Sequence, residues 1–297
     1  MSNLPIGNLP EITEIPAGSK IIVETPQGTK IAGAELVVAG NGAAIHNGIY
    51  RGKDLTDVYT DAQIHAMIAD GSFKDLFVGD YVIKTINTSY GGSERVKFIF
   101  AGFDLFLHDG DTETTAHHAV MLPEDSFKTL AAMNGSNTTA NGYKGSAMHS
   151  TVLPVYAAAI KAAFSNYVLT HREIISNAIS TSGASMAGAG FTGYASGWGW
   201  EDITLRLMNE VQLYGCTVLS SSFYDVGNAN MQFPLFRLNP AKKVAGQGFE
   251  GAVSSRYTFW LSAVASATNF CRCSLNGVAD YYGASDARGV RPYFLLS

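Results

Sequence analysis

The stretch Leu76-Phe77-Val78-Gly79-Asp80-Tyr81-Val82-Ile83-Lys84-Thr85-Ile86 is typical of a β-strand, because β-branched and aromatic residues dominate it on both sides of one Gly-Asp pair. Two further strand candidates, residues 95–106 and 119–122, follow after turns rich in Gly and Asp. Another, residues 290–296, ends the sequence. Short strands joined by turns predict an antiparallel sheet.

A helix is expected at residues 60–71, directly before these strands. Thr60 and Gln63 fit a capping box, and Gly71 can end the helix. Its apolar stripe consists of Ile64, Met67 and Ile68.

Two more helices are expected in the second half of the chain. Apolar residues at three- and four-residue steps predict one over residues 154–179, and another over residues 201–214, ended by Gly215. Residues 183–199 between them are interpreted as a glycine-rich loop, and short strands with turns are expected from Thr217 onward. The predicted class is α+β, with the helices segregated from an antiparallel sheet.

The first 48 residues have a different character. Four of the nine prolines lie among the first 26 residues, and a β-branched run at residues 20–25 is followed by Pro26-Gln27-Gly28 and a second run at residues 29–31. This pattern predicts a hairpin, which is too small to be stable alone and therefore needs a surface to dock on. Residues 39–44 look like a joint. The expected domains are an attachment or oligomerisation segment, 1–48, and a larger domain, 49–297.

The composition excludes several classes of protein. Only 15% of the 297 residues are charged, and the formal net charge is −5, so the chain lacks the basic surface that neutralises nucleic-acid phosphates. No segment approaches 18 continuous apolar residues, so no membrane span is expected. The first residues do not resemble a signal peptide, and synthesis and folding in a cytoplasm are expected. We interpret the low charge as a surface that neighbouring copies or a partner cover.

Several short motifs have both a functional and a structural interpretation. Gly188-x-Gly190-x-x-Gly193 matches a dinucleotide fingerprint in letters, but the preceding strand and following helix are not expected. His117 and His118, with Asp104, Asp109 and Asp111 upstream, lack the spacing of a metal site, and we expect these side chains to bond turn amides and each other. No cofactor or metal is expected, and no nucleophile motif marks an active site.

Three cysteines make an odd number, so no disulfide framework is predicted. Cys271 and Cys273 flank Arg272 and could form a redox pair, or could be reduced thiols on one face of a strand.

From about residue 49 onward, the chain resembles a family of domains common in bacteriophage and prophage proteins. The resemblance rests on ordered blocks: Ile49-Tyr50-Arg51-Gly52-Lys53; Gly71 to Tyr81; Ala101-Gly102-Phe103-Asp104; Gly110-Asp111-Thr112; His117-His118; Met133-Asn134; Asn137-Thr138-Thr139; Gly142-Tyr143; Leu207-Met208-Asn209-Glu210; Tyr257 to Leu261; Asn276 to Tyr281; and Gly289 to Phe294. Val82 stands where relatives often carry Trp. The N-terminal segment resembles the attachment modules of phage fibres.

This resemblance implies a virion protein with a domain related to the C-type lectins and formylglycine-generating enzymes. Such a domain would have its two ends on adjacent strands and would bind through long loops. We expect a non-enzymatic fibre or decoration subunit of the capsid or tail, assembled in the host cytoplasm as a homotrimer and contacting other virion proteins through residues 1–40.

Two alternatives remain: an adhesin for a host glycan or surface protein, and a cysteine-dependent oxidase. The expected contact surface contains Trp198, Trp200, Tyr281 and Tyr282, because aromatic side chains beside loops are common binding anchors. The expected scaffold groups are Asp80, Asp104, Asp111, His117 and Arg291.

Overall fold

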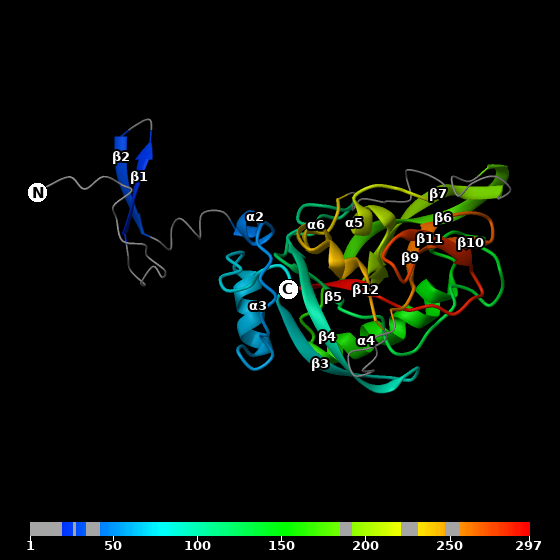
Figure 1. The fold of residues 1–297 in the computed structure, drawn as a ribbon, viewed down its shortest axis with the longest axis horizontal. Coiled ribbons are helices and arrows are strands. Elements are labelled where there is room, and N and C mark those ends of the chain that lie inside the picture. Colours follow the sequence, from blue (N-terminus) through cyan, green and yellow to red (C-terminus); the bar gives the residue numbers. More distant parts are fainter. Residues whose placement is uncertain (1–19, 26–27, 34–41, 185–191, 221–230, 247–255) are drawn as a thin grey trace, which may run out of the picture.

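The computed structural model describes residues 20–25, 28–33, 42–184, 192–220, 231–246 and 256–297 (Figure 1). The helical elements are α2 (Gly42–His46), α3 (Asp61–Ala69), η2 (Met148–Val152), α4 (Leu153–Ala163), α5 (Glu210–Tyr214), α6 (Pro234–Leu238) and η4 (Pro240–Lys243). The strands are β1 (Lys20–Thr25), β2 (Gly28–Gly33), β3 (Tyr81–Thr88), β4 (Gly92–Phe103), β5 (Ala119–Pro123), β6 (His171–Ala184), β7 (Thr192–Ile203), β8 (Arg206–Leu207), β9 (Phe259–Val264), β10 (Asn269–Cys273), β11 (Ala279–Gly283) and β12 (Pro292–Leu296).

The largest sheet has five strands in the order β3-β4-β5-β12-β8, and all of its neighbouring pairs are antiparallel. Its first three strands follow each other in sequence, whereas the last strand of the chain, β12, inserts between β5 and β8. The core forms around it: Phe294 on β12 lies edge-on to Phe98 of β4, with ring centroids 5.6 Å apart. The prediction of an α+β chain with antiparallel sheets is confirmed.

Strand β3 begins at Tyr81, later than the predicted residue 76. The preceding residues form a turn, in which the Asp80 amide donates to the Phe77 carbonyl at 3.1 Å and Gly79 has a φ of +89°. A side chain at Gly79 would also collide with the Tyr50 ring, whose nearest atom is 2.3 Å from an added Cβ. Only glycine suits both constraints.

Helix α3 confirms the first helix prediction. Thr60 accepts a hydrogen bond from the Gln63 amide, and the Gln63 side chain accepts one from the Thr60 amide, which completes a capping box. The buried side chains are Ile64, Met67 and Ile68, as predicted. His65 of the same helix stacks on Tyr167, which follows α4 in the chain, with the ring centroids 4.1 Å apart.

The prediction of a helix over residues 154–179 is wrong beyond its first half. Helix α4 ends at Ala163, and Ser165 and Asn166 then take positive φ values of 53° and 65°, which reverse the chain. The remaining residues belong to β6, which pairs with β7 from His171↔Ile203 onward. The helical spacing was misleading because strand pairing with a distant segment overrides local periodicity.

The glycine-rich loop predicted at residues 183–199 and the helix predicted from residue 201 are also wrong in part. Residues 192–203 form β7, and only Glu210–Tyr214 is helical, ended by Gly215 in the left-handed region. Two positions of β7, 197 and 199, need glycine. An added Cβ at Gly197 or Gly199 would come within 3 Å of the Asn177 side chain on β6. Beyond Thr217, α6 and η4 interrupt the expected run of strands and turns.

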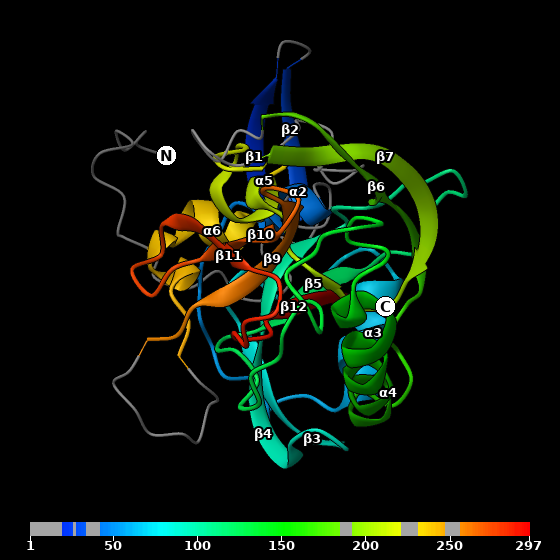
Figure 2. The ribbon, with the colours of Figure 1, turned by 90° about the vertical axis from the view of Figure 1, so that its right-hand side faces the viewer.

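Three smaller sheets complete the described fold. β6 and β7 form a long curved pair (Figure 2). β9, β10 and β11 form a three-stranded sheet in the order β11-β10-β9. The Ser262 amide of β9 donates a 2.8 Å hydrogen bond to the carbonyl of Met208, the residue directly after β8 of the large sheet.

The predicted N-terminal hairpin is confirmed as β1 and β2, which pair from Lys20↔Gly33 to Thr25↔Gly28. Among the described residues, neither strand pairs with any other strand.

One expectation about the larger domain is wrong. Its first strand, β3, and its last, β12, are not neighbours, because β4 and β5 lie between them.

A buried polar cluster joins the elements around β12. Glu173 on β6 is fully buried and forms an ion pair with Arg206 of β8. The Tyr293 hydroxyl of β12 lies 2.7 and 2.8 Å from its two carboxylate oxygens, and His171 Nε2 lies 2.7 Å from one of them. Burial acts to raise the pKa of Glu173, but the charges and hydrogen bonds of these partners outweigh it and hold the pKa below its ordinary value.

Replacing Arg206 with Met should therefore lower the free energy of unfolding by about 3–5 kcal/mol, because it leaves the Glu173 carboxylate buried without its partner. Tyr293→Phe removes one hydrogen-bond donor and should cost about 1–3 kcal/mol. Urea unfolding at neutral pH measures both. An Arg206→Met cost smaller than that of Tyr293→Phe would contradict this account of the cluster.

Candidate functional site

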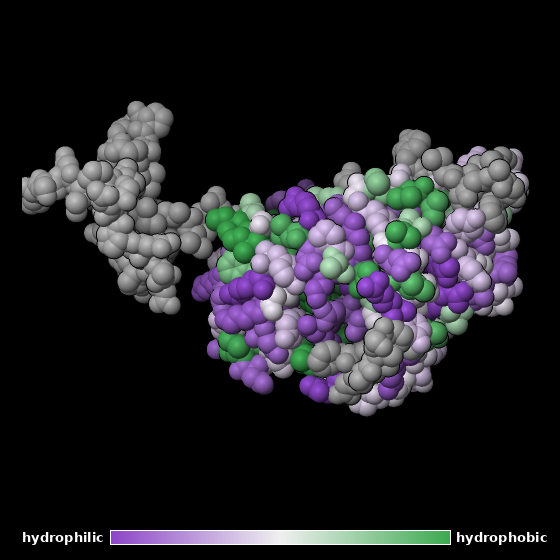
Figure 3. All heavy atoms as spheres, viewed as in Figure 1, coloured by the Kyte–Doolittle hydropathy of each residue, from purple (hydrophilic) through white to green (hydrophobic). Residues whose placement is uncertain are grey.

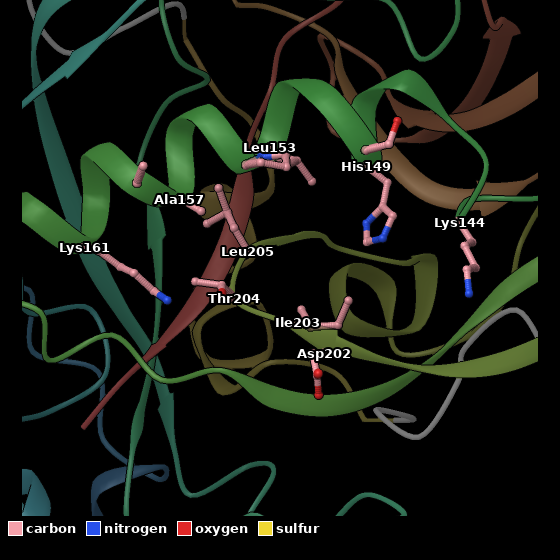
Figure 4. A pocket seen from close by; sticks show the side chains of 12 residues that line it. Lys144, His149, Leu153, Ala157, Lys161, Asp202, Ile203, Thr204 and Leu205 are labelled. Atoms are coloured by element: carbon pink, nitrogen blue, oxygen red, sulfur yellow. The ribbon is translucent and has the colours of Figure 1, made fainter.

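One candidate for a binding site is a groove between α4 and the end of β7, with a volume of about 610 Å³ (Figure 4). Its apolar wall is formed by Leu153, Pro154 and Ala157 of α4, together with Leu205 beyond β7. Ligand pockets of this size commonly have an apolar floor with a few polar groups around it.

Polar side chains from three segments surround this wall. Lys144 forms an ion pair with Glu201, whereas Lys161 has no carboxylate within ion-pair distance among the described residues. Asp202 is 75% exposed, and one of its oxygens lies 3.4 Å from an Arg172 nitrogen.

His149 belongs to the π-helical turn η2 and points into the groove (Figure 4). Its Nδ1 is buried and has no hydrogen-bond partner in the part of the chain that the structure describes. Burial lowers the pKa of His149, so its ring is neutral at neutral pH and can donate through one nitrogen and accept through the other. Single π-helical turns are frequent at functional sites.

A second cavity, of about 340 Å³, adjoins the groove and shares Asp202 with it. Hydroxyl side chains are frequent around this cavity: Thr112, Thr114, Thr115 and Thr170. Thr170 also lies 2.7 Å from Thr204, oxygen to oxygen, and Thr204 lines the first groove.

The four aromatic residues predicted as a contact surface lie on two different sheets. Trp198 and Trp200 lie on β7, two residues apart and therefore on one face, and both are half-buried. Trp198 packs against the core. Tyr281 and Tyr282 lie on β11, where Tyr281 packs against the core and Tyr282 is 41% exposed.

The surroundings of Tyr282 are charged and partly apolar. The guanidinium groups of Arg272 and Arg288 lie 4.3 and 4.2 Å from the centre of its ring. Leu275 and Val278, at the turn between β10 and β11, are also exposed. On the face viewed in Figure 3, apolar side chains are interspersed with polar ones.

Two of the predicted polar groups join loops to the large sheet. Asp80 is fully buried and accepts hydrogen bonds from Arg51 and from the amides of Lys53 and Phe77, at 2.9 and 2.8 Å. Arg291 is fully buried; its Nε donates to the Pro123 carbonyl at 3.0 Å, and burial lowers its pKa to about 10.

The other three predicted polar groups lie around β5 and β6. Asp104 accepts from His117 Nδ1 at 2.7 Å and from the His118 amide at 2.9 Å. Asp111 makes a two-pronged ion pair with Arg172, at 2.7 and 2.8 Å, and this lowers the pKa of Asp111. The described residues include no group of three or more His, Cys, Asp or Glu arranged to hold a metal ion.

Cys271 and Cys273 are buried on β10, and burial raises the pKa of Cys273, so its thiol stays protonated at neutral pH. This environment does not favour the thiolate that the oxidase alternative needs.

Gly188 and Gly190 of the glycine motif lie outside the described residues, and Gly193 lies in β7. The described residues that follow Gly193 continue as β7, whereas a dinucleotide site requires a helix at this position.

Comparison with family models, with curated proteins and with solved structures finds no match for this chain. No helix among the described residues is long and apolar enough to cross a membrane.

Acid should destabilise the protein through His118. This ring is buried, accepts a hydrogen bond from the Phe106 amide at 3.1 Å, and has a pKa lowered by burial to about 4. Since the unfolded histidine titrates near 6.5, this stability is complete above that pH and is lost as the pH falls towards 4, by about 3 kcal/mol.

His118→Gln, which keeps an acceptor, should reduce the loss of unfolding free energy between pH 6.5 and pH 4. Urea unfolding across this range is the measurement, with His108→Gln, at an exposed histidine, as the control. An unchanged pH dependence in His118→Gln would contradict the assignment.

Thiol reactivity should separate the three cysteines. Cys216 is exposed, whereas Cys271 and Cys273 are buried, so a thiol reagent should quickly modify one cysteine in the native protein and all three in denaturant. Cys216→Ser should abolish the fast reaction. Fast reaction of Cys271 or Cys273 in the native chain would instead support the redox alternative.

Proposed function

We propose that this chain is a non-enzymatic structural protein of a bacteriophage virion, a fibre or decoration subunit of the capsid or tail. Its N-terminal segment attaches to other virion proteins, and its α+β part is displayed. The ordered sequence blocks that resemble phage domains support this proposal, and so does the low content of charged residues.

The single observation that carries the proposal is the β1–β2 hairpin. It has two strands, and among the described residues it pairs with no other strand. An isolated two-stranded hairpin is marginal in water, so this one needs a partner surface. A virion protein, or the same hairpin in neighbouring subunits of a homotrimer, supplies such a surface.

For the displayed part we propose a divergent lectin-like domain. Its closing strand lies inside the main sheet, and a second sheet, β9–β11, lies beside it. Long connections between strands are held by buried side chains, such as Asp80 and Arg291. The separation of β3 from β12 is the departure from the expected arrangement.

A second candidate function is that of an adhesin for a host glycan or surface protein. Leu275, Val278 and Tyr282 favour it, because they expose 48%, 60% and 41% of their surface on one β-hairpin. Exposed apolar side chains grouped in this way are typical of interaction sites.

Removing residues 1–40 should abolish incorporation into particles while leaving the displayed part folded, because among the described residues β1 and β2 pair only with each other. The measurement is the amount of protein in purified particles, made by a phage that lacks its own copy and is supplied with the full or the shortened chain. The control is Val278→Ser, which lies far from the β1–β2 hairpin in sequence and should incorporate normally.

Incorporation of the shortened chain at the level of the full chain would overturn the attachment role. The melting temperature of the shortened chain should stay within a few degrees of that of the full chain. Antibody labelling of particles in electron micrographs then distinguishes head from tail.

A further inference from the structure

We propose that the groove between α4 and the end of β7, together with the adjoining cavity, binds a neutral oligosaccharide. This inference assigns a site and a ligand class to the adhesin candidate and rests on that second function, not on virion attachment. The aromatic residues on β7 and β11 that the sequence indicated do not line this site.

The charges around the groove are mixed, which disfavours a strongly charged ligand. Lys161 is a cation without a carboxylate partner among the described residues, and Asp202 is a largely exposed carboxylate. An anionic ligand that approaches Lys161 is repelled by Asp202 and, in the adjoining cavity, by Glu113. A cationic ligand is repelled by Lys144 and Arg172. A neutral ligand avoids both penalties.

Sugar hydroxyl groups suit these mixed partners. Each hydroxyl donates one hydrogen bond and accepts others, so the hydroxyl groups of an oligosaccharide can accept from Lys161 and donate to Asp202, which both line the groove. The neutral ring of His149 lines the groove and offers a further polar contact. Hydroxyl side chains, such as those of Ser150 and Thr204, add groups that both donate and accept.

The apolar wall suits the carbon face of a sugar ring. Leu153, Pro154, Ala157 and Leu205 present aliphatic surface without a polar atom in the side chain. The groove of about 610 Å³ and the cavity of about 340 Å³ share Asp202, so successive sugar units could occupy both. An oligosaccharide therefore fits the site better than a single sugar.

A binding experiment with the full chain tests the proposal. The probes are an array of neutral oligosaccharides built from glucose, galactose, mannose and N-acetylhexosamines, with sialylated and uronic-acid oligosaccharides as a separate set. The best-bound neutral oligosaccharide is then titrated by calorimetry. We expect binding from the neutral set, and an absence of neutral binding at millimolar concentration would overturn the proposal.

Two matched variants on α4 locate the site. Ala157→Phe fills the groove and should weaken binding at least tenfold. Ala162→Phe adds the same ring on the other side of the helix, where Ala162 lines a different cavity, and should leave binding within twofold. Melting temperatures of both variants show that they remain folded.

Two polar variants test the hydrogen-bonding partners. Asp202→Asn and Lys161→Ala should each weaken binding about tenfold, which corresponds to one hydrogen bond to a charged group. If Tyr282→Ala lost binding while Ala157→Phe bound normally, the assignment of the site to the groove would be wrong, and the site would lie on β11. Binding of an acidic oligosaccharide or a peptide alone would overturn the ligand class.

None of these outcomes depends on residues 1–40. The chain can therefore bind sugar and fail to enter particles, or enter particles and fail to bind sugar, and the two proposals are tested separately.

Discussion

The buried carboxylate of Glu173 is the interaction on which the centre of the structure depends. It connects β6 to Arg206 of β8 and to Tyr293 of β12, three strands that are far apart in sequence. A buried charge that loses its partner is costly, so these strands are held in one register. The last strand of the chain, β12, lies in the interior of the main sheet. Its neighbouring residues Tyr293 and Phe294 point to opposite faces of the sheet, where Tyr293 bonds Glu173 and Phe294 packs on Phe98.

The same constraint positions the candidate binding site. Once Glu173 is held in the core, the pairing of β6 with β7 places Asp202 opposite Arg172, and Ile203 opposite His171. The chain beyond β7 then runs past α4 and leaves the groove between them (Figure 4). A local change in β6 would therefore alter both the packing around β12 and the shape of the groove.

Several of the few charged residues of this chain lie inside the fold. Asp80, Arg291 and Glu173 are all fully buried, and each joins segments that are distant in sequence. A charge-poor surface is unfavourable for a free protein at high concentration, since net charge opposes association, but it suits a subunit that is covered by neighbours. The proposed assembly into a virion agrees with this use of charge.

Local sequence signals were reliable where the structure depends on neighbouring residues. The capping box of α3, the glycine that ends α5, the β1–β2 hairpin and the order β3-β4-β5 were all predictable, because each involves residues that are close along the chain. The groove side chains carried no recognisable motif. The polar residues His171 and Glu173, two residues apart and directly before Ile174-Ile175, are the one signal that could have indicated the buried cluster.

The sequence by itself therefore determined the α+β class, the N-terminal hairpin and the helix boundaries that local caps mark. Only the tertiary structure decided that residues 171–179 belong to a strand instead of a helix, that β12 lies inside the sheet, and that Lys161, His149 and Asp202 face one groove. The physical reason is that strand register and burial depend on contacts between segments many residues apart, and these contacts override local periodicity.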